Sequence, residues 1–300
     1  EVGRPEVPYV RERGGTVLGE CTIRLMGTSN DPPIGNAGTK VLMAMDGGVI
    51  ALHGAEKTSW SRLARTIPKM SSQSELKAEE ASGWQPGDQI VVTGSKWDRS
   101  EAARGAGSGL GTQELGYETA VVDTVNASGF SGDWTVTISS SPFQELHLGR
   151  EAFAGGVKGP QTFTLTDPRA PGPQWSAPPG VPLELDQSVE VANLTRNVKV
   201  VGEVVPPEAS TGQSFGGHVM VMKCSDCTAA GGFGRFSHVE FWNMGQDTED
   251  GLGRYPVHFH MLKSEGDGQY VHDCSIHQRI KRAITIHGPA HVTDKNNVAN

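Results

Sequence analysis

The stretch Gly253-Arg254-Tyr255-Pro256-Val257-His258-Phe259-His260 is matched 27 residues later (287 − 260) by Ile284-Thr285-Ile286-His287. The two segments share an apolar–polar alternation that ends in histidine. Repeats of about 20 to 30 residues with short strands and no helix are typical of a parallel β-helix, in which each coil stacks on the last. This spacing therefore predicts stacked parallel strands in the C-terminal third of the chain.

A second match supports the repeat: Val271 and Asp273 reappear as Val292 and Asp294, 21 residues later (292 − 271). Leucine-rich repeats have a similar period, but the sequence lacks their regular Leu/Asn framework. Short β-branched and aromatic runs recur from residue 217, separated by Gly, Asn and Asp. The strands expected there are 218–222, 236–241, 257–261, 270–276, 283–286 and 292–298.

The N-terminal part has a similar β character but no clear period. Val41–Met45 and Val49–Leu52 flank Asp46-Gly47-Gly48, which is a hairpin signal. Only Ser74–Ala81 has helical character. The 39 Gly and 18 Pro residues among 300 favour many short strands joined by tight turns.

We predict an all-β chain in three parts: a glycine-rich β domain, a β-rich connecting segment and a right-handed parallel β-helix. The connecting segment contains the Pro/Gly-rich stretch 168–182, which is expected to be a long loop. The glycine-rich stretch 105–116 is also expected to be a loop. The predicted boundaries are 1–125, 126–205 and 206–300.

Composition excludes some classes of function. The formal net charge of −8 argues against nucleic acid as a partner. No apolar run is long enough to span a bilayer. The chain begins at Glu1 and ends at Asn300 within the repeat pattern, so we interpret it as part of a longer protein.

Four cysteines form an even set that could pair in three ways: Cys21, Cys224, Cys227 and Cys274. The Cys224-Ser225-Asp226-Cys227 segment has the spacing of half a zinc site or of a redox motif. No second such pair exists, so a disulfide or buried thiols are favoured.

Two glycosylation sequons occur, at Asn126-Ala127-Ser128 and Asn193-Leu194-Thr195. They are expected to lie on the surface and fit an extracellular protein.

Several segments, in order along the chain, resemble a cell-surface family that includes the hyaluronidase CEMIP, its transmembrane relative and fibrocystin-L. The resemblance implies an eight-glycine domain followed by β-helix repeats, at the cell surface. Its partners would be other surface or filament proteins, as in cilia, or glycans such as hyaluronan. The matching segments are 46–54, 59–63, 84–92, 189–191, 194–198, 215–218, 245–246, 253–260, 274–277 and 282–288.

The same resemblance leaves two functions open. One is a structural or adhesive surface module like fibrocystin-L, and the other is a glycan-binding or glycan-depolymerising ectodomain like CEMIP. Where hyaluronan-cleaving members carry acidic residues before Phe215-Gly216-Gly217-His218, this chain has Ser210–Ser214. It also has Ser188 in place of an Arg. Both changes remove charge from a possible glycan site and favour the structural function.

Histidines are the best candidates for chemistry. His258 and His260 are two apart on one strand and so share a face, and the 27-residue offset sets His287 beside His260. His218, on an earlier coil, could approach them. Such a cluster could be internal packing, a site for Zn²⁺ or another divalent metal, or an acid–base pair acting on a sugar. If the chain cleaves glycans, the catalytic candidates are Arg196, Asp273 and His258.

Overall fold

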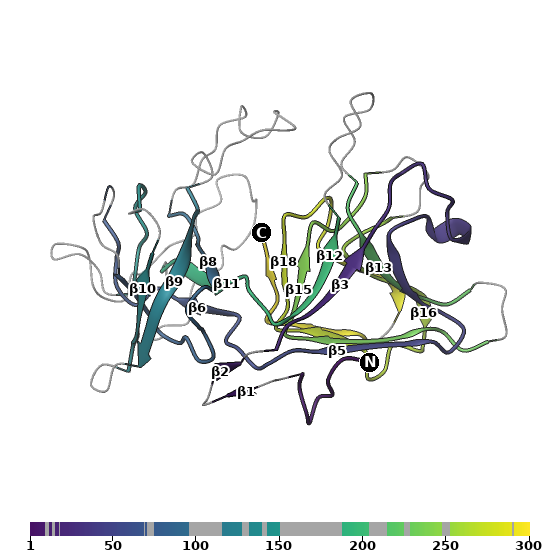
Figure 1. Cartoon of the computed structure of the whole chain (residues 1–300), viewed down its shortest axis with the longest axis horizontal. Coiled ribbons are helices and arrows are strands. Elements are labelled where there is room, and N and C mark those ends of the chain that lie inside the picture. The colour runs from purple at the N-terminus through teal and green to yellow at the C-terminus, as the bar shows by residue number, and fades with distance from the viewer. Residues whose placement is uncertain are drawn as a thin grey trace, which may run out of the picture. The chain divides into compact units, whose positions relative to one another are not determined.

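The structure is a computed structural model of the whole chain (Figure 1). The residues described are 1–9, 12–13, 16–17, 19–68, 70, 75–95, 116–127, 132–139, 143–150, 188–203, 215–224, 229–247, 253–289 and 291–300. The predicted loops at 105–116 and 168–182 lie outside these residues, apart from Gly116.

The chain forms two compact units, each built from separated segments. Unit 1 consists of Glu1–Trp60, Ala81–Ile90 and Ala192–Asn300, and unit 2 of Ser61–Glu80 and Val91–Val191. This division differs from the predicted boundaries, because residues from both ends of the sequence build unit 1.

Unit 1 is a parallel β-helix with three sheets, and each of its first four coils contributes one strand to each sheet. The first sheet holds β3 (Cys21–Leu25), β12 (Val198–Gly202), β15 (Val239–Trp242), β18 (Ser275–His277) and β21 (Val298–Ala299). The second holds β4 (Val41–Ala44), β13 (His218–Met222), β16 (Val257–Lys263) and β19 (Ile284–Pro289). The third holds β5 (Val49–His53), β14 (Phe233–Ser237), β17 (Tyr270–His272) and β20 (Thr293–Lys295). The predicted all-β fold with a parallel β-helix is confirmed.

The first coil of this helix comes from the N-terminal part of the chain. In Figure 1, purple β3 lies beside green β12, with which it pairs in parallel. The hairpin predicted around Asp46-Gly47-Gly48 is wrong, because β4 pairs with β13 and β5 with β14. Asp46 and Gly47 have φ values of 51° and 78°, and the bend there turns a corner of the coil instead of reversing the strand.

The 27-residue offset is confirmed by the pairing of β16 with β19, in which His260 lies opposite His287. The 21-residue offset is wrong by two residues: Val271 lies opposite Asp294, at 23 residues (294 − 271). Three predicted strands, 236–241, 270–276 and 292–298, are each divided between two sheets. The divisions fall at His238, Asp273 and Asn296, whose φ values of 52°, 55° and 55° form left-handed corners.

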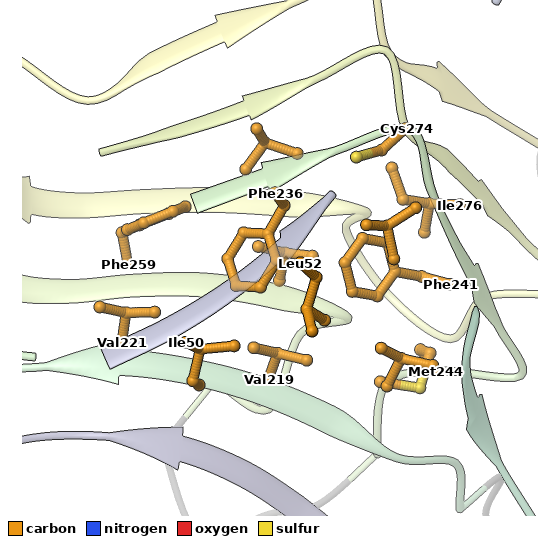
Figure 2. Close-up of a cluster of buried hydrophobic side chains, with 14 of the residues drawn as sticks. Ile50, Leu52, Val219, Val221, Phe236, Phe241, Met244, Phe259, Cys274 and Ile276 are labelled. Atoms are coloured by element: carbon orange, nitrogen blue, oxygen red, sulfur yellow. The ribbon is translucent and has the colours of Figure 1, made fainter. Parts of the chain in front are cut away.

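The core of unit 1 is a column of apolar side chains that point inward from all three sheets (Figure 2). Val219 and Phe259 come from the second sheet, Leu52 and Phe236 from the third, and Phe241 from the first. The rings of Phe236 and Phe241 meet edge to face, with centroids 5.8 Å apart. Every coil thus packs on the coils above and below it, as stacked repeats require.

The largest sheet among the described residues has six strands in the order β6-β11-β8-β9-β10-β7. Its strands are β6 (Trp60–Arg62), β7 (Glu75–Ala78), β8 (Gln89–Val92), β9 (Glu118–Ala127), β10 (Trp134–Ile138) and β11 (Glu190–Asn193). A short antiparallel pair, β1 (Glu12–Arg13) and β2 (Thr16–Val17), and one 3-10 turn, η1 (Gly35–Ala37), complete the described elements.

The helical character expected over Ser74–Ala81 is wrong. Glu75–Ala78 is strand β7, which pairs antiparallel with β10. Leu76 and Ala78 are buried while Glu75 is exposed and Lys77 half-buried, an alternation with period two. That period suits one buried face of a sheet and does not suit a helix.

Candidate functional site

Strand β16 presents alternate side chains to opposite faces of the second sheet. Val257 and Phe259 belong to the inward-facing core. His258 and His260 therefore point outward, since successive residues of a strand face opposite ways. His287 of β19 lies opposite His260 and faces outward with it. The three imidazoles share the outer face of two adjacent coils.

Among the described residues, these three histidines form the group whose ring nitrogens could hold one metal ion. One ring nitrogen from each lies within 4.8 Å of the others. His258 Nε2 and His260 Nδ1 are 3.3 Å apart. His258 is buried, His260 half-buried and His287 exposed, so the cluster opens to solvent on the side of His287.

Burial favours the neutral form of the His258 and His260 rings. Burial, with the nearby charges of His260 and His287, lowers the pKa of His258 to about 4. Burial and His287 also lower the pKa of His260. His258 Nδ1 donates a hydrogen bond to the Gly253 carbonyl at 2.8 Å, so the lone pair of the neutral ring is on Nε2, where it accepts a hydrogen bond from His260 Nδ1 at 3.3 Å. A metal or a proton can take the place of that hydrogen bond on Nε2.

Thr285 is a functional candidate that the sequence reasoning missed. It lies opposite His258 in the register of β16 and β19 and shares the outer face with His287. Its Oγ1 atom is buried and has no hydrogen-bond partner among the described residues. The signal was available in the sequence, because the 27-residue offset aligns Thr285 with His258.

The structure does not bring His218 into the cluster. His218 is fully buried at the start of β13, where its partner in β4 is Val41. The β13 residues opposite His258 and His260 are Met220 and Met222. His218 therefore lies two residues before the register position that a fourth ligand would need.

Arg196 is fully enclosed and uses its guanidinium within the protein. Its Nη1 donates to the carbonyls of Asn193 and Thr195, both at 2.9 Å. Its Nη2 donates to Ser59 Oγ at 3.1 Å, and its Nε to the Asp273 carbonyl at 3.1 Å. With 1% of its surface exposed, Arg196 is not available to a glycan.

Further charges surround Arg196 and are also paired. Lys57 forms a salt bridge with Asp88 at 2.7 Å, and Glu240 Oε1 lies 3.1 Å from His277 Nε2. Glu240 also accepts a hydrogen bond from the Arg196 amide at 2.9 Å. Of the three catalytic candidates, Arg196 lies in this buried polar network, while Asp273 is half-buried and accepts the Arg196 hydrogen bond through its backbone carbonyl. His258 lies on the second sheet, in the histidine cluster.

The two sequons have different environments. Asn193 is fully buried, and its Nδ2 donates to Asp88 Oδ2 at 2.7 Å, so its expected surface position is wrong. Asn126 is exposed on β9. The amide of Asn193 is needed to pair a buried carboxylate, and the tripeptide pattern carries no information about that contact.

When the folded protein is secreted from eukaryotic cells, we therefore expect glycosylation at Asn126 and none at Asn193. Intact-mass spectrometry before and after glycosidase treatment should show one N-glycan, which the Asn126→Gln variant lacks. An attached glycan at Asn193 in folded material would contradict the buried position.

The cysteines also differ from one another. Cys224 is disulfide-bonded, while Cys21 and Cys274 are free thiols. Cys227 lies outside the described residues. Cys274 is buried in the core, and burial raises the pKa of its thiol to about 12. Neither Cys21 nor Cys274 therefore contributes to a disulfide framework.

Comparison with known protein families agrees with this architecture. Residues 2–64 match the G8 domain, and residues 214–300 match the CEMIP β-helix. The residues that match the G8 domain include all three strands of the first coil, so part of this matching segment is built into the β-helix.

The relatives that this chain matches are long proteins. Human fibrocystin-L is 28% identical over 93% of this chain, and the human cell surface hyaluronidase CEMIP2 is 29% identical over 70%. A G8 domain-containing protein of Dictyostelium discoideum is 27% identical over 87%. The chain spans 6%, 12% and 17% of these relatives.

The tailspike of Pseudomonas phage phi297 is similar at 13% identity over 87% of this chain and 40% of the tailspike chain. The TM-score is 0.24, which is too low to support a structural conclusion. In the part of the chain that the structure describes, no helix has the length and hydrophobicity to cross a membrane.

Proposed function

We propose that this chain is a structural or adhesive module of an extracellular, cell-surface protein, in which the β-helix acts as a rigid element. The observation that carries the proposal is the continuous stack of coils. Each of the three sheets pairs strands from successive coils in parallel, over one uninterrupted apolar core. Stacked repeats of this kind resist bending because every coil is bonded to its neighbours along its length.

The position of Arg196, a candidate residue for glycan cleavage, also supports the structural function. Arg196 is enclosed, and its guanidinium donates hydrogen bonds within the protein. The net charge of −8 also disfavours binding of an anionic polymer through overall electrostatic attraction. Other surface or filament proteins are therefore the favoured partners.

One observation favours a second function, glycan binding or depolymerisation. The cluster of His258, His260 and His287 faces outward, and His287 is exposed. Such a cluster could act on a sugar chain as a general acid or base. The relative CEMIP2 is named a hyaluronidase. This function requires the histidine cluster, while the structural function does not.

Incubation with hyaluronan of uniform length separates the two functions. We expect light scattering after size-exclusion chromatography to show unchanged hyaluronan, with or without added divalent metal. Beads coated with the chain should adhere to one another or to a cell layer, and beads coated with heat-unfolded chain should not. Shortening of hyaluronan that the His260→Ala variant abolishes would overturn the structural function in favour of the second.

A further inference from the structure

We propose that His258, His260 and His287 form a binding site for a single divalent transition metal, with Zn²⁺ the best fit, across two adjacent coils of the β-helix. The proposal holds whichever of the two functions above is correct. It rests on the spacing of the ring nitrogens, on the hydrogen bond that orients His258, and on the unpaired hydroxyl of Thr285.

The spacing of the nitrogens is close to what a tetrahedral metal needs. Two nitrogens that each lie about 2.0–2.1 Å from a tetrahedral zinc ion are about 3.3–3.4 Å apart. His258 Nε2 and His260 Nδ1 are already 3.3 Å apart. The third nitrogen lies within 4.8 Å of both and belongs to the exposed ring of His287. A rotation of that ring would bring its nitrogen to the third corner of the tetrahedron.

The ligand atom of His258 is selected by its other nitrogen. Nδ1 donates to the Gly253 carbonyl at 2.8 Å, so the proton is held there and Nε2 faces the cluster. Hydrogen bonds of this kind fix the tautomer and ring orientation of metal-binding histidines. The ring is further positioned by Tyr255, whose ring meets it edge to face at a centroid distance of 5.1 Å.

Three protein ligands leave a fourth tetrahedral position, which a water could occupy. A metal-bound water in that position would be a hydrogen-bond donor. Thr285 Oγ1 is a buried acceptor that lacks a partner among the described residues, and it lies opposite His258 in register. A buried hydroxyl normally has a partner, and a metal-bound water would supply one.

The donor set also indicates the class of metal. Three imidazoles suit Zn²⁺, Cu²⁺, Ni²⁺ or Co²⁺, whereas Ca²⁺ and Mg²⁺ require oxygen ligands. Because two ligands come from β16 and one from β19, the bound ion would link the third and fourth coils. It would therefore stabilise the folded chain.

Calorimetric titration of untagged, chelator-treated full chain with Zn²⁺ should show one binding site, and Ca²⁺ should give no heat. His260→Ala and His287→Ala should each weaken Zn²⁺ binding at least tenfold. The thermal midpoint should rise with Zn²⁺ in the unmodified chain and rise less in both variants at the same Zn²⁺ concentration. His291→Ala is the matched control, because His291 is an exposed histidine paired with Asp267, and it should bind like the unmodified chain.

Circular dichroism of each variant without metal checks that the β-helix remains folded. His287→Ala is the safer variant, since His287 is exposed and its loss leaves the core intact. Absence of a stoichiometric Zn²⁺ site would overturn the proposal. So would tight binding that survives both His260→Ala and His287→Ala, because the ion would then be held elsewhere.

Thr285→Val tests the fourth position. The chain loaded with Co²⁺ should show the intense visible absorption of a tetrahedral ion, and Thr285→Val should shift that spectrum while keeping one bound Co²⁺ per chain. A weak, octahedral spectrum in the unmodified chain would rule out the three-histidine, one-water site. An unchanged spectrum in the variant would exclude Thr285 as the partner of the bound water.

Discussion

Replacing Phe236 with Ala is expected to lower the free energy of unfolding by about 3–5 kcal/mol, the usual cost of removing a buried aromatic ring. Phe236 is fully buried at the centre of the cluster in Figure 2. Its ring meets Phe241 and Phe259 edge to face, at centroid distances of 5.8 and 6.3 Å. These three rings come from three different sheets, so the cavity would disrupt packing in every direction around the coil.

Urea unfolding followed by near-ultraviolet circular dichroism measures this loss. Phe236→Leu should cost less than Phe236→Ala, because it retains most of the buried apolar volume. Val49→Ala is the surface control: Val49 is 62% exposed on the neighbouring strand β5, and its removal should change stability by less than about 0.5 kcal/mol. A loss below about 1 kcal/mol for Phe236→Ala would contradict a tightly packed core at this position.

Replacing Arg196 with Ala is expected to cost a similar amount, about 3–5 kcal/mol, for an electrostatic reason. Three backbone carbonyls accept hydrogen bonds from this guanidinium, those of Asn193, Thr195 and Asp273. The substitution would leave these groups without their donor, and nearby Glu240 would lose a compensating positive charge. Unpaired buried groups of this kind carry the full penalty of having lost water.

Arg196→Lys should recover only a small part of this loss. A single ammonium group cannot reach the acceptors that the planar guanidinium reaches from three nitrogens. Arg24→Ala is the matched control, since Arg24 is exposed on β3, and it should be nearly neutral. If Arg196→Ala left stability unchanged but altered the binding of hyaluronan, Arg196 would have to be a ligand contact instead of a structural residue.

The histidine cluster shows how much of the candidate site can be predicted from the sequence. A strand alternates its faces with period two, so His258 and His260 share a side wherever the strand lies. The 27-residue repeat then fixes the pairing of His260 with His287, because like residues stack in successive coils. What the repeat cannot give is the orientation of each ring. That depends on the Gly253 carbonyl, which comes from the segment before β16.

The sequence by itself determined the parallel β-helix and the position of its histidine cluster, because both follow from local alternation and a regular repeat. The tertiary structure alone decided that β3, β4 and β5 form the first coil, since their partners lie beyond residue 197 and no local pattern records the pairing. It also decided that Arg196 and Asn193 are buried. Their polar groups could equally serve a surface site, and only contacts between distant segments enclose them.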